Sequence, residues 1–279
     1  MNFSSHTLHS PVAVFDSGFG GLTVLRALRE QLPEEDFFYF ADTRYFPYGE
    51  RPAEFLRARC VAIAQALQQA GAKALVIACN TASAVAAEAI RAAVNVPVVA
   101  LEPGLKPAVE LSRNGRIGVL ATQRTLESER FQRLLASYGA GKEIFGEACT
   151  GLADAIENEG PNSSKVAALL DRYVTPLQAA QVDTVVLGCT HYPWASLQIA
   201  QRLSPGTQLV DTGAAVARQL TRRLQAEQRA GGGQGRLLAG TSADPAALAD
   251  KLERLWGASL PLVFWAPQAV AADVRPCVS

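Results

Sequence analysis

Histidine and cysteine are scarce in this chain of 279 residues, which holds three histidines and five cysteines. Two of the histidines lie within the first ten residues, and no two cysteines have the C-x-x-C spacing. A structural zinc site needs about four such ligands, and a disulfide-stapled fold is short and rich in cysteine. The sequence therefore supports neither a metal centre nor a disulfide framework, and no metal is expected.

A surplus of positive charge and a long hydrophobic run are also lacking. Lys and Arg total 26, as do Asp and Glu, so the formal net charge is zero. Because nucleic acids and anionic membranes are recognised by basic surfaces, neither is expected as a partner. No apolar run approaches the roughly 18 residues of a membrane helix, and the start of the chain lacks the features of a signal peptide. We expect a cytoplasmic protein with a small-molecule substrate, and a homodimer as a candidate assembly.

The chain instead shows an alternation of strand-like and helix-like segments. Short runs rich in Val and Ile predict buried strands at residues 12–15, 37–40, 74–78, 96–101, 117–120, 184–187 and 207–210. Between them, apolar residues recur at helical spacing, as at 56–67 and 166–177, and segment 157–164 has the composition of a loop. This order is typical of an α/β fold in which helices cover a mostly parallel sheet.

Two parts of the sequence resemble each other. LVIACNT (75–81) matches VVLGCTH (185–191) in pattern at an offset of 110, and VFDS (14–17) matches VLAT (119–122) at an offset of 105. Because the two pairs keep their order and nearly their spacing, they predict two α/β halves of one plan, beginning near Val12 and Arg116. Chance similarity between buried strands is the alternative.

Polar residues follow the predicted strands directly. They are Asp16, Ser17, Asp42, Cys79, Asn80, Thr81, Thr122, Cys189, Thr190 and His191. Ligands bind at the carboxyl ends of the strands in open parallel sheets. Each residue alone has an ordinary explanation: a cysteine after a strand is commonly a small buried side chain, and Thr81 could cap a helix at 82–94. Their clustering at equivalent ends of the two halves favours a site instead.

The GFGG segment at 18–21 is similar to a dinucleotide-binding loop, but Thr23 stands where that loop has its third glycine. A tight turn between strand and helix is the better interpretation, and its amides could bind a carboxylate at the start of the helix. No nucleotide cofactor is therefore expected.

Cys79 and Cys189 hold matching positions in the two halves, so they would face one cleft from opposite sides. Two thiols on opposite faces of a small molecule suit proton exchange at carbon. One, as thiolate, removes a proton, and the other, as thiol, returns a proton on the far face. A free thiol has a pKa of about 8.5, which a helix N-terminus or a histidine can tune toward neutrality.

Four motifs occur in an order that resembles the glutamate racemases. They are FDSGFGGLTV at 15–24, ADT at 41–43 with FPYGER at 46–51, ACNTAS at 78–83 and GCTHYP at 188–193. Weaker similarity extends from Val12 to Gly213, so the resemblance covers most of the chain. It implies a cofactor-independent amino-acid racemase that makes D-glutamate for peptidoglycan.

The resemblance also implies roles for individual residues. Cys79 and Cys189 are the acid/base pair, and the substrate contacts are Asp16, Ser17, Tyr48, Gly49, Asn80, Thr81, Thr122, Thr190 and His191. Asp16 and His191 would assist the neighbouring thiols, with Asp42 and Glu157 as supporting candidates. Since no Lys or Arg is among these contacts, neutral donors would hold both carboxylates of glutamate, and Asp16 would hold its ammonium.

The domain organisation follows from the same resemblance. It implies two similar α/β domains related by pseudo-two-fold symmetry, with the active site between them. On this interpretation residues 1–104 and 212–279 form the first domain, and residues 105–211 form the second.

Other functions stay open at this point. A racemase of the same superfamily that acts on aspartate or another compact acid differs only in details around Tyr48 and His191. A hydrolase with Cys79 as nucleophile and His191 as base would leave the matched Cys189 without a role. A non-catalytic binding protein would not need both thiols and their polar neighbours, all of which are present. Glutamate racemase is the preferred hypothesis.

Overall fold

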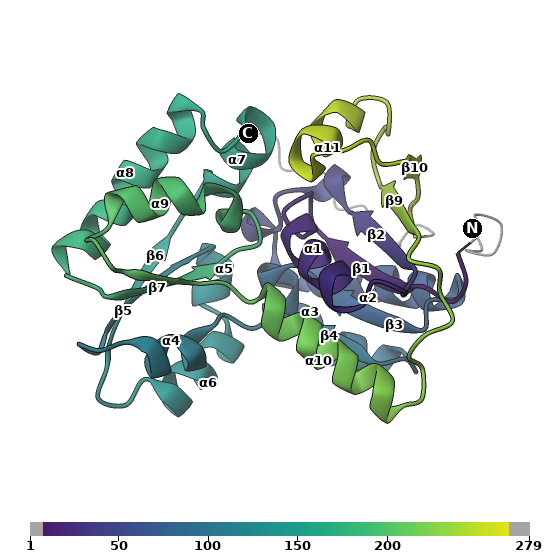
Figure 1. Cartoon of the computed structure of the whole chain (residues 1–279), viewed down its shortest axis with the longest axis horizontal. Coiled ribbons are helices and arrows are strands. Elements are labelled where there is room, and N and C mark those ends of the chain that lie inside the picture. Colours follow the sequence, from purple (N-terminus) through teal and green to yellow (C-terminus); the bar gives the residue numbers. More distant parts are fainter. Residues whose placement is uncertain (1–7, 268–279) are drawn as a thin grey trace.

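Two parallel β-sheets, each flanked by helices, lie side by side in the computed structural model, which describes residues 8–267 (Figure 1). The larger sheet has six strands in the order β10-β9-β2-β1-β3-β4, and the smaller sheet has four in the order β6-β5-β7-β8. The pairings between neighbouring strands are parallel throughout both sheets. The predicted α/β class with mostly parallel sheets is confirmed.

The predicted strands are all present, and three further ones join them. The larger sheet comprises β1 (Val12–Asp16), β2 (Phe37–Ala41), β3 (Ala74–Ile77), β4 (Val98–Ala100), β9 (Leu237–Thr241) and β10 (Leu262–Phe264). The smaller sheet comprises β5 (Arg116–Ala121), β6 (Glu143–Ala148), β7 (Thr184–Gly188) and β8 (Gln208–Val210). Sequence analysis missed β6, β9 and β10.

Helices connect the strands and cover both faces of each sheet. Around the larger sheet lie α1 (Leu22–Gln31), α2 (Ala53–Gln69), α3 (Asn80–Ala93), α10 (Gly213–Ala226) and α11 (Ala249–Trp256). Around the smaller sheet lie α4 (Leu105–Leu111), α5 (Gln123–Leu126), α6 (Glu129–Tyr138), α7 (Leu152–Glu159), α8 (Ser164–Ala179) and α9 (Ser196–Arg202). Short 3-10 helices η2 (Thr43–Tyr45), η3 (Tyr48–Glu50) and η4 (Tyr192–Ala195) follow strand ends.

The repeat seen in the sequence is preserved in the pairing of the strands. Val12 of β1 pairs with Ala74 of β3, and Ile117 of β5 pairs with Thr184 of β7. Val12 and Ile117 are 105 residues apart and Ala74 and Thr184 are 110 apart, which are the offsets of the matching sequence segments. The order β2-β1-β3-β4 thus corresponds to β6-β5-β7-β8. The strands that precede the two candidate thiols, β3 and β7, occupy equivalent places.

The chain passes from one sheet to the other and back. After β4 it enters α4, which packs against α6, β7 and β8 of the smaller sheet. After β8 it enters α10, which packs along α1 of the larger sheet. The division into domains at 104/105 and 211/212 stays a prediction, and residues 1–7 and 268–279, which it assigns to the first domain, lie outside the described residues.

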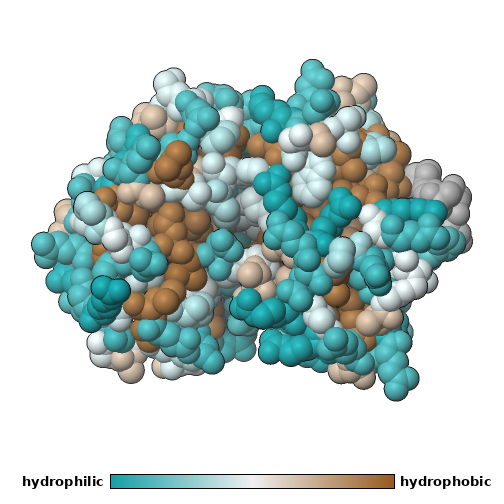
Figure 2. Space-filling model, in the orientation of Figure 1, coloured by the Kyte–Doolittle hydropathy of each residue, from teal (hydrophilic) through white to brown (hydrophobic). Residues whose placement is uncertain are grey.

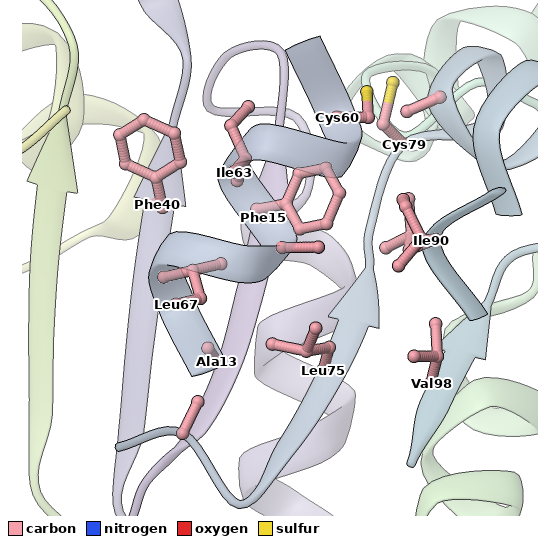
Figure 3. Close-up of a cluster of buried hydrophobic side chains, with 14 of the residues drawn as sticks. Ala13, Phe15, Phe40, Cys60, Ile63, Leu67, Leu75, Cys79, Ile90 and Val98 are labelled. Atoms are coloured by element: carbon pink, nitrogen blue, oxygen red, sulfur yellow. The ribbon is translucent and has the colours of Figure 1, made fainter. Parts of the chain in front are cut away.

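Apolar side chains fill both faces of the larger sheet, because parallel strands covered by helices are buried on two sides. Phe15 of β1 belongs to the cluster beneath α2 and α3, whereas Val14 belongs to the cluster beneath α1 and α10. Figure 3 shows Cys60 and Cys79 together at one end of the first cluster. Cys79 therefore lies where the core meets the carboxyl ends of the strands.

Two expectations about helix ends are wrong. The helix expected at 82–94 begins at Asn80, so Cys79 rather than Thr81 is its N-cap residue. The segment expected as a loop from residue 157 begins with the end of a helix, because α7 runs through Glu159 and stops at Gly160, which has a φ of 92°. Glycine adopts such a φ without the strain that other residues meet, so the turn starts there.

The visible surface is largely hydrophilic, with apolar patches, and it is hollowed between the two halves (Figure 2). Large apolar side chains that reach solvent include Leu111, Leu197 and Phe264. Within residues 8–267, no helix combines the length and the apolar character needed to cross a bilayer.

Ser163 is the N-cap residue of α8, and a substitution at this position tests how much the cap stabilises the helix. The Ser163 hydroxyl oxygen accepts a hydrogen bond from the Val166 amide. Because Ser163→Ala leaves that amide without its partner, we expect the free energy of unfolding to fall by about 1 kcal/mol. Ser164→Ala, which changes the exposed next residue and not the cap, should have a much smaller effect. Urea denaturation of both variants measures the difference, and equal losses would contradict the cap assignment.

Candidate active site

The carboxyl ends of strands from both sheets meet at one place. Thr190, after β7, donates a hydrogen bond of 2.9 Å from its hydroxyl to Asp16 Oδ2 at the end of β1. The hydroxyls of Thr81, after β3, and Thr122, after β5, lie 3.0 Å apart. These cross-sheet bonds bring together most of the sequence-predicted residues: Asp16, Ser17, Cys79, Asn80, Thr81, Thr122, Cys189, Thr190 and His191.

Asp16 is fully buried, and its carboxylate accepts four hydrogen bonds. Oδ1 accepts from the amide and the hydroxyl of Ser17, at 2.6 and 3.2 Å, and Oδ2 accepts from the Gly21 amide at 2.5 Å and from Thr190. Burial raises the pKa of Asp16, whereas the charge of His191 and the hydrogen bonds act in the opposite direction. A Cβ at Gly21 would lie 2.9 Å from Oδ2, so glycine is needed for this close approach.

Cys79 is a buried thiol at the N-cap position of α3. It is 5% exposed, and its Sγ lies 3.8 Å from Ser17 Oγ. Burial and the Asp16 carboxylate raise the pKa of Cys79 well above its ordinary value, although the Ala82 amide favours the thiolate. Cys79 is therefore a thiol at neutral pH in this structure, which is the form that can donate a proton.

Cys189 lies in a different electrostatic setting. Its Sγ is 3.8 Å from His191 Nδ1, and His191 Nε2 is 2.7 Å from Glu157 Oε2. Burial opposes the charged imidazolium, but the hydrogen bonds to Cys189 and Glu157 outweigh it and raise the pKa of His191 well above its ordinary value. Glu157 Oε2 also accepts a hydrogen bond of 2.7 Å from the Phe19 amide, so this series of contacts also connects the two halves. A cation thus stands beside the second thiol.

Neutral donors also gather at the strand ends that carry the two thiols. Asn80 is 4% exposed, and its Nδ2 has no hydrogen-bond partner among residues 8–267. Gly49 faces Thr122 so closely that a Cβ on it would lie 3.1 Å from the Thr122 methyl carbon. Thr122 in turn joins its hydroxyl to Thr81 and to Thr125. The amide and hydroxyl groups of this wall are suited to a carboxylate.

Asp42 and Tyr48 lie behind this wall. The Tyr48 hydroxyl donates to Asp42 Oδ2 at 2.5 Å, and Arg59 donates to both carboxylate oxygens of Asp42. The side-chain hydrogen bonds of Asp42 therefore go to Tyr48 and Arg59 rather than to a thiol. Its predicted support of proton transfer stays a prediction.

A cavity of about 310 Å³ adjoins the second thiol. It lies between α1, η4 and the start of α10, and its wall includes Asn80, Cys189 and Thr190. The hollow between the two halves is visible in Figure 2. A volume of this size is sufficient for a small ligand. In the described part of the chain, His, Cys, Asp and Glu side chains form no group of three that could hold a metal ion.

Comparison with known proteins assigns the family. The model of the Asp/Glu/hydantoin racemase family matches residues 21–220. The chain belongs to this family. It is 44% identical to the glutamate racemase of Pseudomonas aeruginosa over 264 residues, which are 93% of this chain and 96% of that protein. It is 48% identical to the glutamate racemase of Cupriavidus pinatubonensis over 215 residues, 77% and 79% of the two chains.

Solved structures agree with the family assignment. A glutamate racemase of Bacillus anthracis superimposes with a TM-score of 0.82 at 30% identity, over 91% of this chain and 96% of that one. The Escherichia coli glutamate racemase, solved with L-glutamate and the activator UDP-MurNAc-Ala, superimposes with a TM-score of 0.81 at 32% identity, over 94% and 100% of the chains. The protein is thus an amino-acid racemase, an isomerase of the glutamate racemase group.

Sequence reasoning missed one residue that shapes the site, Arg59. It lies on α2 between Leu56 and Cys60, on the face that packs into the core, and it is 7% exposed. A charged residue on the apolar face of a predicted helix was the available signal, since such a residue needs a buried partner. The hydrolase alternative also loses support, because the hydrogen bonds of the His191 ring go to Cys189 and Glu157 and not to Cys79.

The His191–Glu157 pair generates a pH-dependent prediction. Because the pKa of His191 is raised on folding, its protonation contributes stability that is fully present below the unfolded-state pKa of about 6.5 and is lost as pH rises through the folded-state pKa. Glu157→Gln removes a charged partner, so we expect the folded-state pKa of His191 to fall and this contribution to be lost at lower pH.

Unfolding free energies of the wild type and Glu157→Gln, measured from about pH 5.5 to 9.5, test this linkage. The difference in unfolding free energy between the wild type and Glu157→Gln should be largest at the lowest pH and should decrease as pH rises. Glu159→Gln, on the same helix but paired with Lys165 at the surface, should leave the pH profile unchanged. A difference in unfolding free energy that stays constant across this pH range would contradict the linkage between Glu157 and His191.

Proposed function

We propose that the protein interconverts L- and D-glutamate by moving a proton at Cα between two thiols, Cys79 and Cys189. The observation that carries the proposal is the equivalent placement of these buried cysteines after β3 and β7, in two halves whose strand ends meet. A racemase must remove a proton from one face of a carbon and deliver one to the other. The names of the curated relatives, and the L-glutamate bound to the Escherichia coli enzyme, support glutamate as the substrate.

The two thiols take opposite roles in each direction of the reaction. In the L-to-D direction Cys189, as thiolate beside the charged His191, takes the proton from Cα. Cys79, kept as a thiol by burial and by Asp16, gives its proton to the opposite face. Cys189 ends as a thiol and Cys79 as a thiolate, so protons and charge balance, and the D-to-L direction reverses these roles.

Neutral donors are proposed to hold the substrate. The neutral donors would come from Ser17, Tyr48, Gly49, Asn80, Thr81, Thr122 and Thr190, with the free Nδ2 of Asn80 as one carboxylate donor. Because the Tyr48 hydroxyl already donates to Asp42, Tyr48 would act through its backbone. His191 would act through its charge beside Cys189. Donors aimed at the α-carboxylate also stabilise the negative charge that develops there when Cα loses its proton. The Asp16 carboxylate already accepts hydrogen bonds from Ser17, Gly21 and Thr190, and it would attract the substrate ammonium through its charge.

The wider role follows from the family. D-glutamate made by this reaction would supply peptidoglycan synthesis in the cytoplasm. The reaction as proposed uses only side chains of the protein and needs no cofactor. Assembly into a homodimer stays a prediction.

Solvent isotope incorporation tests whether a protein group carries the proton. L-glutamate turned over in D2O should yield D-glutamate that carries deuterium at Cα, because a thiol exchanges its proton with solvent. Mass spectrometry of the separated enantiomers measures the label. Product that retains only the original hydrogen would point to direct hydrogen transfer and would overturn the proposal.

Serine variants test the division of work between the thiols. Serine keeps the shape, but its hydroxyl is far less acidic, so Cys79→Ser and Cys189→Ser should each lower racemisation by at least about a hundredfold. A substrate analogue with a leaving group at Cβ separates the roles, since elimination needs only the abstracting base. Cys189→Ser should still eliminate from the D-analogue, and Cys79→Ser from the L-analogue.

Cys149→Ser is the matched control, because this buried thiol contacts the Glu147 carbonyl and a serine hydroxyl can make the same contact. It should racemise at close to the wild-type rate. Elimination from the same enantiomer by both site variants would show that the two-sided assignment is incorrect.

A further inference from the structure

Arg59 is a buried cation that contacts the end of β2 and the η2 turn directly after it. It projects from α2, and its side chain is 8% exposed. Its Nε and Nη2 donate to Asp42 Oδ2 and Oδ1 at 2.9 and 2.7 Å, a two-pronged pair at the end of β2. Its Cζ also lies 4.7 Å from the centre of the Tyr45 ring in η2. Arg59 therefore ties helix, strand end and the following loop together.

The Asp42 carboxylate passes this constraint to Tyr48. Asp42 is fully buried, and the Tyr48 hydroxyl donates to the same Oδ2 that accepts from Arg59 Nε. Burial and the Asp42 charge raise the pKa of Tyr48 well above its ordinary value, so its hydroxyl remains a neutral donor. The orientation of Tyr48 thus depends on a carboxylate that Arg59 holds in place.

Tyr48 begins the 3-10 helix η3, and the next residue, Gly49, belongs to the site wall. η3 packs against α3, which starts after Cys79, and against α5 of the other half, which starts after Thr122. Gly49 lies so near the Thr122 side chain that an added Cβ would be 3.1 Å from its methyl carbon, and the Thr122 hydroxyl pairs with Thr81. A continuous series of contacts therefore links Arg59 to the wall that faces the substrate, although Arg59 itself lies behind it.

We propose that Arg59 is a positioning residue for substrate binding, because its two-pronged pair with Asp42 holds Tyr48 and Gly49 against Thr122. The inference deepens the proposed function and rests on it for the identity of the substrate. A buried ion pair is weak evidence for stability alone, since well-packed apolar residues often serve as well. Its geometry is suited instead to fixing one arrangement of the loop.

The experiment compares Arg59→Met and Arg59→Lys with Lys73→Met. Lys73 forms the matched buried pair with Glu35 in the same half, and it anchors Gly231 rather than the site. Loss of either pair should lower the melting temperature. Only the Arg59 variants should raise KM for L-glutamate, by roughly tenfold or more, with a smaller change in kcat. The reason is that a displaced loop no longer holds the substrate-binding groups in place. Lysine keeps the charge but cannot donate to both oxygens of Asp42 in the two-pronged manner of arginine. The KM of Arg59→Lys should therefore lie between the values of the wild type and Arg59→Met.

A second readout needs no substrate. The loop between β2 and η3 carries an exposed arginine, Arg44. If the loop is loosened, trypsin should cleave faster between Arg44 and Tyr45, and the masses of the fragments measure the rate. The inference would be overturned if trypsin cleaved Arg59→Lys no faster than Lys73→Met. It would also be overturned if the KM for L-glutamate rose equally in Arg59→Lys and Lys73→Met. Arg59→Lys carries the test if Arg59→Met fails to fold. A wild-type protein that does not racemise glutamate would overturn the proposed function, and the cleavage rates would still decide the placement of the loop.

Discussion

The carboxylate of Asp16 is the constraint on which the site depends. An anion taken out of water costs free energy unless hydrogen bonds replace its hydration. Here the replacement comes from Ser17 and Gly21 in one half and from Thr190 in the other. The turn after β1 must therefore curl tightly around Asp16, and the same turn presents the Phe19 amide to Glu157. One buried charge thus fixes a loop and joins two sheets.

The remaining charges of the site are held in compensated pairs. Asp42 pairs with Arg59, and Glu157 pairs with His191, each fully or nearly fully buried. Pairing in this way satisfies the buried charges and leaves uncharged amides and hydroxyls to face the site.

Periodicity and the repeat predicted much of the fold, and the reasons for the misses are physical. β1, β3, β5 and β7 are central strands buried on both faces, so their apolar runs are continuous and easily recognised. β6 is half-exposed at a sheet edge, and its sequence EIFGEA mixes charged and apolar residues. The candidate thiols could be found because they follow central strands. Arg59 could not be placed from spacing alone, because its partner Asp42 lies on another segment 17 residues away.

The same plan, repeated twice, gives the two thiols unequal surroundings. Cys79 stands near the Asp16 carboxylate, whereas Cys189 stands near a histidine whose pKa is raised. The repeat supplies matched positions at β3 and β7, and the residues that differ between the halves supply the opposite charges. In the proposed reaction of L-glutamate, this inequality favours Cys189 as the base and Cys79 as the acid. Turnover of L-glutamate leaves a thiolate beside Asp16, the less favourable arrangement, so the substrate ammonium near Asp16 would offset that charge during the step. The asymmetry between halves is therefore as necessary to the proposed chemistry as their symmetry.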